Sequence, residues 1–223
     1  MMQMSGNKML TLDENFALAV KNHKTNNLQV AENLYNKILK IDPNYANAHN
    51  NLGILFQSLG EDRKAKDCFE KAVEINPNYA AANNNLGFIY QCLDDSKNAK
   101  EFYEKAIEIN PDYAEAYNNL GNILYHINED QEAVKCYEKA IEIDPDYADA
   151  YSNLGNVFYE TDENSKAIKY FEKALSYDTC NKENTFTGYS GALIKSNEHK
   201  KGLKMLTEVQ GAIVFKKNKF EII

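Results

Sequence analysis

Four asparagines of this chain are separated by intervals of 34 residues, and each precedes a leucine–glycine pair in a segment with helical character. Asparagine is a poor helix former because its amide competes for nearby backbone groups. A side-chain amide carries both a donor and an acceptor, so it can pair with the N–H and the C=O of a peptide backbone. Amides at regular spacing could therefore hold an extended peptide. The four residues are Asn51, Asn85, Asn119 and Asn153.

The same period of 34 residues organises the sequence around these asparagines. Counted from the start of each block, leucine–glycine occupies positions 7 and 8, alanine positions 20 and 27, and an aromatic residue position 24. Positions 4, 7, 8 and 11 fall on one face of a helix, and positions 20, 24, 27 and 28 on one face of a second helix. The blocks are 46–79, 80–113, 114–147 and 148–181, with a weaker copy at 12–45.

Each block is therefore expected to form two amphipathic helices. Asp or Asn precedes Pro43, Pro77, Pro111 and Pro145, and the residue before a proline is pushed out of the α region, which predicts the end of each second helix. One such pair cannot bury its apolar face alone, so neighbouring blocks must stack. The predicted fold is an all-α solenoid.

The combination of Leu-Gly, Ala, aromatic, Ala and Pro at this period resembles the tetratricopeptide repeat over about residues 12–181. The stretch AIEIDPDYADAYSNLG at 140–155 is most similar to the repeat superhelix of O-GlcNAc transferases and to similar bacterial arrays. The resemblance implies a right-handed α-solenoid whose first helices line a concave groove. Two features depart from the family. The position that holds tryptophan in the family is occupied here by His49, Asn83, Tyr117 and Tyr151. The first block has Ala17 and Ala19 where Asn and Gly are expected.

These patterns divide the chain into four parts. Residues 1–11 are an N-terminal extension, 12–181 five repeats, 182–210 a degenerate capping repeat, and 211–223 a C-terminal tail. In the capping repeat Ser190–Gly191 stands where leucine–glycine is expected, two residues late by phase. The tail is either frayed or docked through Phe215 and Phe220. The polar outer face that a terminal repeat needs is predicted at Lys195, Lys200, Lys201 and Lys204.

The candidate binding surface lies opposite the packing face of the first helices, at positions 2, 6, 9 and 13. The resemblance implies that this face lines the concave groove. It also implies that the position-6 asparagines correspond to the asparagine ladder of O-GlcNAc transferases. Ile54 and Phe88 make the early part apolar, and three acids make the later part negative, so the expected partner is a protein or peptide with an apolar segment and a basic segment. The predicted peptide-binding residues are Asn51, Asn85, Asn119, Asn122, Asn153, Asn156, Ile54, Phe88, Glu115, Asp149 and Glu160. Asn50, Asn84 and Asn118, at position 5, are expected on the flank of the groove.

Three alternatives accompany this interpretation. The amides could instead bond to one another or to a neighbouring helix and stabilise the stack. A co-chaperone clamp, which holds C-terminal carboxylates with paired Lys and Arg, is disfavoured because only Lys21 and Lys24 of the first block are basic in this stripe. The repeats could also be the substrate-recruiting arm of a larger O-GlcNAc-transferase-like glycosyltransferase. The sequence leaves that question and the oligomeric state open.

Composition restricts the remaining function classes. The 223 residues are 43% hydrophobic and 26% charged, with a net charge of −8, which argues against nucleic acid as a partner. Block 114–147 alone carries −6, from eight acids and two lysines. No segment approaches the length of about eighteen apolar residues that spans a membrane, and the start lacks the pattern of a signal peptide. A cytoplasmic protein without membrane contact is expected.

No catalytic or metal-binding motif is present in the sequence. The four histidines are scattered, and there is no H-E-x-x-H, G-x-S-x-G or phosphate-binding glycine-rich loop. The cysteines contain no C-x-x-C pair, so they are interpreted as small apolar filler rather than as metal ligands or redox groups. The prediction is a non-enzymatic chain without metal or cofactor. The cysteines are Cys68, Cys92, Cys136 and Cys180.

Overall fold

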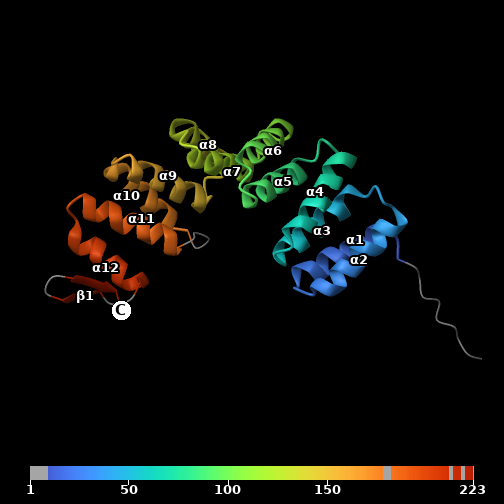
Figure 1. Cartoon of the computed structure of the whole chain (residues 1–223), viewed down its shortest axis with the longest axis horizontal. Coiled ribbons are helices and arrows are strands. Elements are labelled where there is room, and N and C mark those ends of the chain that lie inside the picture. The colour runs from blue at the N-terminus through green and yellow to red at the C-terminus, as the bar shows by residue number, and fades with distance from the viewer. Residues whose placement is uncertain (1–9, 178–181, 211–212, 217–218, 223) are drawn as a thin grey trace, which may run out of the picture. The chain divides into compact units, whose positions relative to one another are not determined.

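The computed structural model describes residues 10–177, 182–210, 213–216 and 219–222. The chain divides into two compact units, Met1–Asn110 and Pro111–Ile223. In each unit consecutive helices form pairs, and within a unit each pair packs on the next (Figure 1). The predicted fold class, an all-α solenoid of helix–turn–helix repeats, is confirmed for the described residues up to 210.

The first unit contains three helix pairs among its described residues. Its buried core includes the leucine of position 7 and the aromatic residue of position 24, as in Leu52 and Phe69, which are 4% and 0% exposed. Burying a side chain of this size contributes roughly 1.5–3 kcal/mol. The pairs are α1 (Leu12–Lys24) with α2 (Leu28–Ile41), α3 (Ala46–Ser58) with α4 (Asp62–Ile75), and α5 (Ala80–Cys92) with α6 (Ser96–Ile109).

The second unit also contains three helix pairs, followed by a hairpin in the described part of the tail. The strands β1 (Ile213–Lys216) and β2 (Lys219–Ile222) are antiparallel, with Phe215 opposite Phe220. These strands are not predicted from the sequence, which leaves the tail either frayed or docked. The helix pairs are α7 (Ala114–His126) with α8 (Asp130–Ile143), α9 (Ala148–Glu160) with α10 (Asn164–Leu175), and α11 (Lys182–Lys195) with α12 (His199–Gln210).

The second helices end where the prolines predict. Asp42 has φ −130° and ψ 95°, and Asp144 has φ −125° and ψ 94°, so both have left the α region. The carboxylate of each also accepts a hydrogen bond from the N–H two residues on, at 3.0 Å from Asn44 and 3.1 Å from Asp146. This side-chain turn fixes the direction in which the next first helix begins.

The residues at the family's tryptophan position bond to the same linkers. The Asn83 amide donates to the carbonyl of Pro77 at 3.3 Å, and the Tyr151 hydroxyl donates to the carbonyl of Pro145 at 3.2 Å. His49 Nε2 lies 2.9 Å from the carbonyl oxygen of Pro43. At these three positions a polar group therefore ties the first helix to the linker before it.

The glycines of position 8 allow the two helices of a repeat to approach closely. A Cβ atom added to Gly121 would lie 2.6 Å from the Tyr137 ring, and one added to Gly155 would lie 2.6 Å from the Phe171 ring. A Cβ atom added to Gly53 would approach the Phe69 ring in the same way, and one added to Gly87 would approach the Tyr103 ring. Close helix packing therefore explains the periodic glycines.

The turn between the two helices of a repeat places position 15 in the left-handed region. Gly60 has φ 72°, and the equivalent residues Asn26, Asp94, Asn128 and Asp162 have φ between 59° and 62°. Asn and Asp tolerate this conformation better than other residues with a Cβ atom. The positions therefore select Gly, Asn or Asp for backbone reasons alone.

Gly60→Ala is expected to lower the free energy of unfolding by about 1 kcal/mol, because alanine is strained at positive φ. No atom lies within 4 Å of an added Cβ at Gly60, so the effect isolates backbone strain. Gly60→Asn is the matched control and should lose less than half as much. Urea unfolding of the three proteins measures both. Equal losses for alanine and asparagine would contradict the backbone explanation.

The helix pair α11–α12, predicted as the capping repeat and called by that name below, is shifted throughout by one residue relative to the 34-residue period. Its first helix ends at Lys195, and its left-handed turn residue is Asn197, each 35 residues after its counterpart in the preceding repeat. Tyr189 and Ser190, 3% and 1% exposed, consequently take the places of leucine and glycine. The prediction that Ser190–Gly191 fills them two residues late is wrong, because the added residue precedes this helix and the turn keeps its length of three residues.

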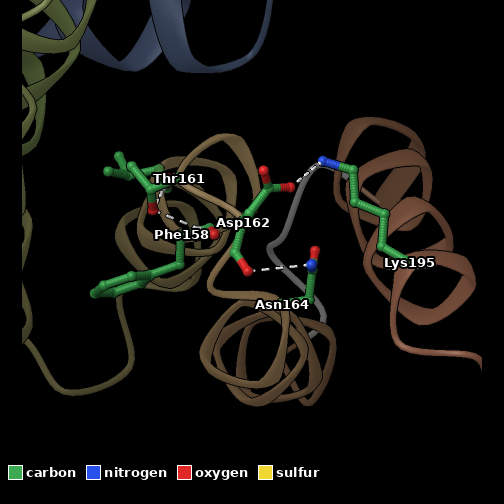
Figure 2. Close-up of polar contacts among 6 residues, drawn as sticks. Phe158, Thr161, Asp162, Asn164 and Lys195 are labelled. Carbon is green, nitrogen blue, oxygen red and sulfur yellow. Dashed lines mark hydrogen bonds and ion pairs between the residues drawn. The ribbon is translucent and has the colours of Figure 1, made fainter.

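Polar contacts join the capping repeat to the repeat before it. Lys195 Nζ on α11 lies 2.7 Å from the Asp162 carboxylate in the α9–α10 turn (Figure 2). The hydroxyls of Ser152 and Thr185 lie 2.8 Å apart and are buried. Lys195 is exposed, so its ion pair contributes at most about 1 kcal/mol.

Candidate peptide-binding site

The surface at positions 2, 6, 9 and 13 of the first helices, here called the first-helix stripe, is accessible in both units. Positions 2 and 13 are exposed except for half-buried Ala81, and positions 6 and 9 are half-buried except for exposed Phe88. Side chains here can meet a ligand without rearrangement. The stripe comprises Asn47, Asn51, Ile54, Ser58, Ala81, Asn85, Phe88 and Cys92 in the first unit, and Glu115, Asn119, Asn122, His126, Asp149, Asn153, Asn156 and Glu160 in the second.

In the first unit the two position-6 amides have different partners. Asn51 Nδ2 donates to the backbone carbonyl of Asn47 in its own helix at 2.9 Å. Asn85 Nδ2 donates to Asn50 Oδ1 of the preceding repeat at 3.0 Å. Beside them, Ile54 packs against the core and Phe88 is 36% exposed. This half of the stripe combines the apolar side chains of Ile54 and Phe88 with three amides.

In the second unit Asn153 links two repeats. Its Nδ2 donates to Asn118 Oδ1 at 2.9 Å and to Asn122 Oδ1 at 3.0 Å. Asn122 Oδ1 also accepts a hydrogen bond from the Tyr137 hydroxyl at 2.9 Å. Asn119 and Asn156 are half-buried on the same stripe. The amides here form a connected network.

The capping repeat ends the series of position-6 side chains. Gly188 lies 35 residues after Asn153, the offset that this repeat shows throughout. A Cβ atom at Gly188 would lie 2.9 Å from Asn156 Oδ1 and 2.6 Å from the Phe171 ring. A side chain at this point is excluded by contact, so the asparagine series stops at the fourth member.

The position-5 residues are buried, and the prediction that they lie on the groove's flank is wrong. Asn50, Asn84, Asn118 and Ser152 are 4%, 1%, 5% and 7% exposed. A helical wheel describes one helix against its own partner, whereas Asn50 and Asn118 are also contacted by the first helix of the next repeat, through Asn85 and Asn153. The missed signal is the pair of adjacent asparagines that recurs in three blocks, at 50–51, 84–85 and 118–119.

The bonds from Asn85 and Asn153 to the preceding repeat support a structural role for these two amides. An asparagine amide offers two N–H donors and one carbonyl acceptor. The Asn85 bond uses one of those N–H groups and not the carbonyl. A position-6 side chain therefore has the chemical capacity to stabilise the stack and to pair with a ligand.

The stripe of the second unit carries the negative charge. Glu115, Asp149 and Glu160 are exposed. Burial, followed by the charges of Glu115 and Asp149, raises the pKa of Tyr147. Burial, followed by the charge of Glu160, raises the pKa of Tyr125. The acids therefore act on the side chains around them as negative charges.

The three cysteines among the described residues, Cys68, Cys92 and Cys136, form no disulfide bond. Burial raises the pKa of the half-buried Cys68 to about 11, so it is protonated at neutral pH and suits the predicted filler role. Cys92 is exposed, so the filler interpretation is wrong for that residue, and Cys180 lies outside the described residues. Within the described ranges, no group of three potential metal ligands comes together. In the same part of the chain, no helix has the length and apolar character to cross a membrane.

Tetratricopeptide repeat models match the chain at 46–79 and 148–178, at 80–113 and at 102–135, and a TPR repeat model matches 121–162. The chain is 30% identical to the protein in a crystal structure of MamA, with a TM-score of 0.63, and the match covers 71% of this chain and 92% of that one. The chain belongs to the tetratricopeptide repeat (TPR) family. The specific resemblance to O-GlcNAc transferases stays a prediction, because these matches identify only the repeat.

Two further solved structures share the TPR fold. PilW, described as a widely conserved type IV pilus biogenesis factor, has a TM-score of 0.80 at 20% identity, covering 89% of this chain and 92% of that one. YrrB, described as a TPR protein with an unusual peptide-binding site, has a TM-score of 0.62 at 21% identity, covering 79% and 92%. No curated protein sequence matches the chain. Both comparisons show that this chain has the TPR fold.

Proposed function

We propose that this TPR protein is a non-catalytic scaffold that binds an extended peptide segment along the first-helix stripe. The observation that carries the proposal is the accessible row of half-buried position-6 amides, Asn51, Asn85, Asn119 and Asn153, at one place in four successive repeats. Asn51 bonds only within its own helix, and a surface residue of this kind needs no fixed identity for stability. The structure of YrrB, titled for its peptide-binding site, has the same fold.

Recognition would combine two kinds of contact. The amides pair with the N–H and C=O groups of the peptide, which makes binding tolerant of the peptide's side chains. Phe88 offers an exposed aromatic ring to an apolar segment, and Glu115, Asp149 and Glu160 attract Lys or Arg in a second segment. Partner choice then depends on the order of apolar and basic segments.

The absence of catalysis is part of the proposal. The polar groups that the proposed binding uses are amides and separate carboxylates, and holding an extended peptide needs no activated nucleophile. No cofactor or metal is required for the binding described. Purified protein that hydrolyses a substrate, with loss of that activity on one point mutation, would contradict this part.

Binding is tested with a synthetic peptide of twelve residues, apolar in its first half and lysine-bearing in its second. Phe88→Ala should weaken binding about tenfold, and Asn51→Ala about fivefold, through loss of the ring contact and of one backbone pairing. Both melting temperatures should stay near that of the unchanged protein, because Asn51 bonds only within its own helix and Phe88 is exposed. Isothermal titration calorimetry and thermal unfolding give the two quantities.

The control variant is Asn33→Ala, an exposed asparagine on a second helix, which should leave affinity unchanged. A peptide with N-methylated backbone nitrogens tests the amide pairing directly and should bind at least about tenfold more weakly. Equal affinity of the Asn51 and Phe88 variants with the unchanged protein would exclude the stripe as the binding surface.

A further inference from the structure

At repeat position 25, in the second helix, a glutamate contacts both a lysine and a tyrosine. This arrangement occurs at two of the junctions where one repeat packs on the next, and each such junction is called a step here. Between α4 and α5, Lys66 Nζ lies 2.8 Å from Glu70 Oε1 and 5.2 Å from the centre of the Tyr90 ring. The Tyr90 hydroxyl donates to the same carboxylate oxygen at 3.3 Å. The lysine is thus held by a carboxylate and an aromatic face together.

The same chemistry recurs where α10 packs on the capping repeat. Lys201 Nζ lies 3.2 Å from Glu172 Oε1 and 5.3 Å from the centre of the Tyr189 ring. The Tyr189 hydroxyl donates to Glu172 Oε1 at 2.6 Å. Here the lysine comes from α12, a different helix from that of Lys66. The lysine beside the position-25 glutamate can therefore come from the same helix as the glutamate or from a different one.

The step between α8 and α9 has the glutamate and the ring, but within the described residues no lysine is paired with that glutamate. Glu138 stands at position 25, and Phe158 occupies the place of Tyr90. Val134 replaces Lys66, and phenylalanine has no hydroxyl to donate to the carboxylate. Glu138 has no hydrogen bond or ion pair within the described part of the chain.

A cavity of about 490 Å³ opens at this step. Val134 and Phe158 form its apolar wall, and the carboxylates of Asp130, Glu138 and Glu163 outnumber the single ammonium of Lys135. Lys166 Nζ lies 4.9 Å from the centre of the Phe158 ring, but its charge is paired with Glu163 at 2.5 Å. Two carboxylates of this cavity, those of Asp130 and Glu138, therefore have no ion pair within the described residues. Of the two, only Glu138 stands at repeat position 25.

We propose that the α8–α9 cavity is a docking site for a lysine side chain presented by a partner protein. The methylene stem would lie against Val134 and Phe158, and the ammonium would pair with Glu138, which reproduces the contacts that Lys66 and Lys201 make within the chain. Long basic side chains commonly bury their stems on apolar surface in this way. Charge complementarity and the two internal examples identify the occupant.

This site is distinct from the first-helix stripe. Phe158 is at position 11, on the face of α9 that is turned toward the second helices, whereas the stripe residues lie on the other side of the helix. A partner can therefore occupy the cavity whether or not a peptide lies along the stripe. The two surfaces are tested by different variants.

The test uses the full chain labelled with ¹⁵N and the probe acetyl-Ala-Lys-Ala-amide. The lysine peptide should shift backbone amide signals around Val134, Glu138 and Phe158 in a saturable manner. The same peptide with an Nε-acetylated lysine should bind about tenfold more weakly, because it has lost its charge. Val134→Lys should weaken binding of the lysine peptide to a similar degree, since the new side chain fills the cavity as Lys66 fills its own.

The matched variant is Lys66→Val, which opens the equivalent space beside Glu70 and Tyr90. It should gain saturable shifts there that the unchanged protein lacks. Glu138→Gln keeps the shape of the site and should also weaken binding, which covers the case in which Val134→Lys does not fold. Circular dichroism verifies the folding of each variant.

Three results would overturn the proposal. One is equal binding of the charged and acetylated peptides. A second is undiminished binding by a folded Val134→Lys or Glu138→Gln variant. The third is self-association of the free chain, measured by sedimentation, that Val134→Lys abolishes, because the occupant would then be a second copy rather than a partner protein.

Discussion

Replacing Gly155 with alanine is expected to lower the free energy of unfolding by about 1–2 kcal/mol, although alanine is the better helix former. The added Cβ would lie 2.6 Å from the Phe171 ring, well inside contact distance. The same ring meets Gly188 of α11, where an added Cβ would also lie 2.6 Å away, so two backbones confine it. Overpacking of roughly 1–3 kcal/mol outweighs a gain in helix propensity of about 1 kcal/mol.

Chemical denaturation of the full chain measures this loss. Ser165→Ala, an exposed change on α10, is the control and should alter stability by less than about 0.5 kcal/mol. Phe171→Leu combined with Gly155→Ala should recover part of the loss, since the smaller side chain makes room for the methyl group. A stability gain from Gly155→Ala alone would show that the helices separate at little cost and that close packing does not select this glycine.

Asn153→Ala is expected to destabilise the protein by about 1.5 kcal/mol, whereas Asn51→Ala should leave stability unchanged or raise it by about 0.5 kcal/mol. Both residues occupy position 6. Asn153 donates to Oδ1 of Asn118, which is 5% exposed and would be left without this donor. A buried acceptor without a partner costs about 1–3 kcal/mol, and the improved helix propensity of alanine offsets only part of it.

Thermal and urea unfolding of the two single variants give the comparison, and a double-mutant cycle with Asn118→Ala isolates the pair. Coupling of about 1 kcal/mol between positions 118 and 153 is the expected result. Equal stability of the Asn51 and Asn153 variants would contradict a structural role for the bond between repeats. Peptide affinity measured on the same proteins then shows whether a position-6 asparagine that bonds to the preceding repeat also contributes to peptide binding.

The sequence by itself determined the repeat and its local structure. Leucine–glycine, alanine and proline at a period of 34 residues specify two helices and a linker in each block, because these signals act within a few residues of where they stand. The left-handed turn residues, such as Asn128, follow from the same short-range chemistry. The stripe of accessible side chains could also be predicted, since an isolated helix pair already distinguishes its packed face from its opposite face.

Only the tertiary structure decided what happens between repeats. Asn50 and Asn118 are buried because the next first helix covers them, and no pattern within one block contains that neighbour. The phase of the capping repeat, with Tyr189 and Ser190 in the core, depends on where α11 meets α10. The lysine that binds Glu172 comes from α12, 29 residues along the chain. Among the described residues, no lysine is paired with Glu138. Such contacts join residues that are distant in the chain, so packing rather than local preference selects them.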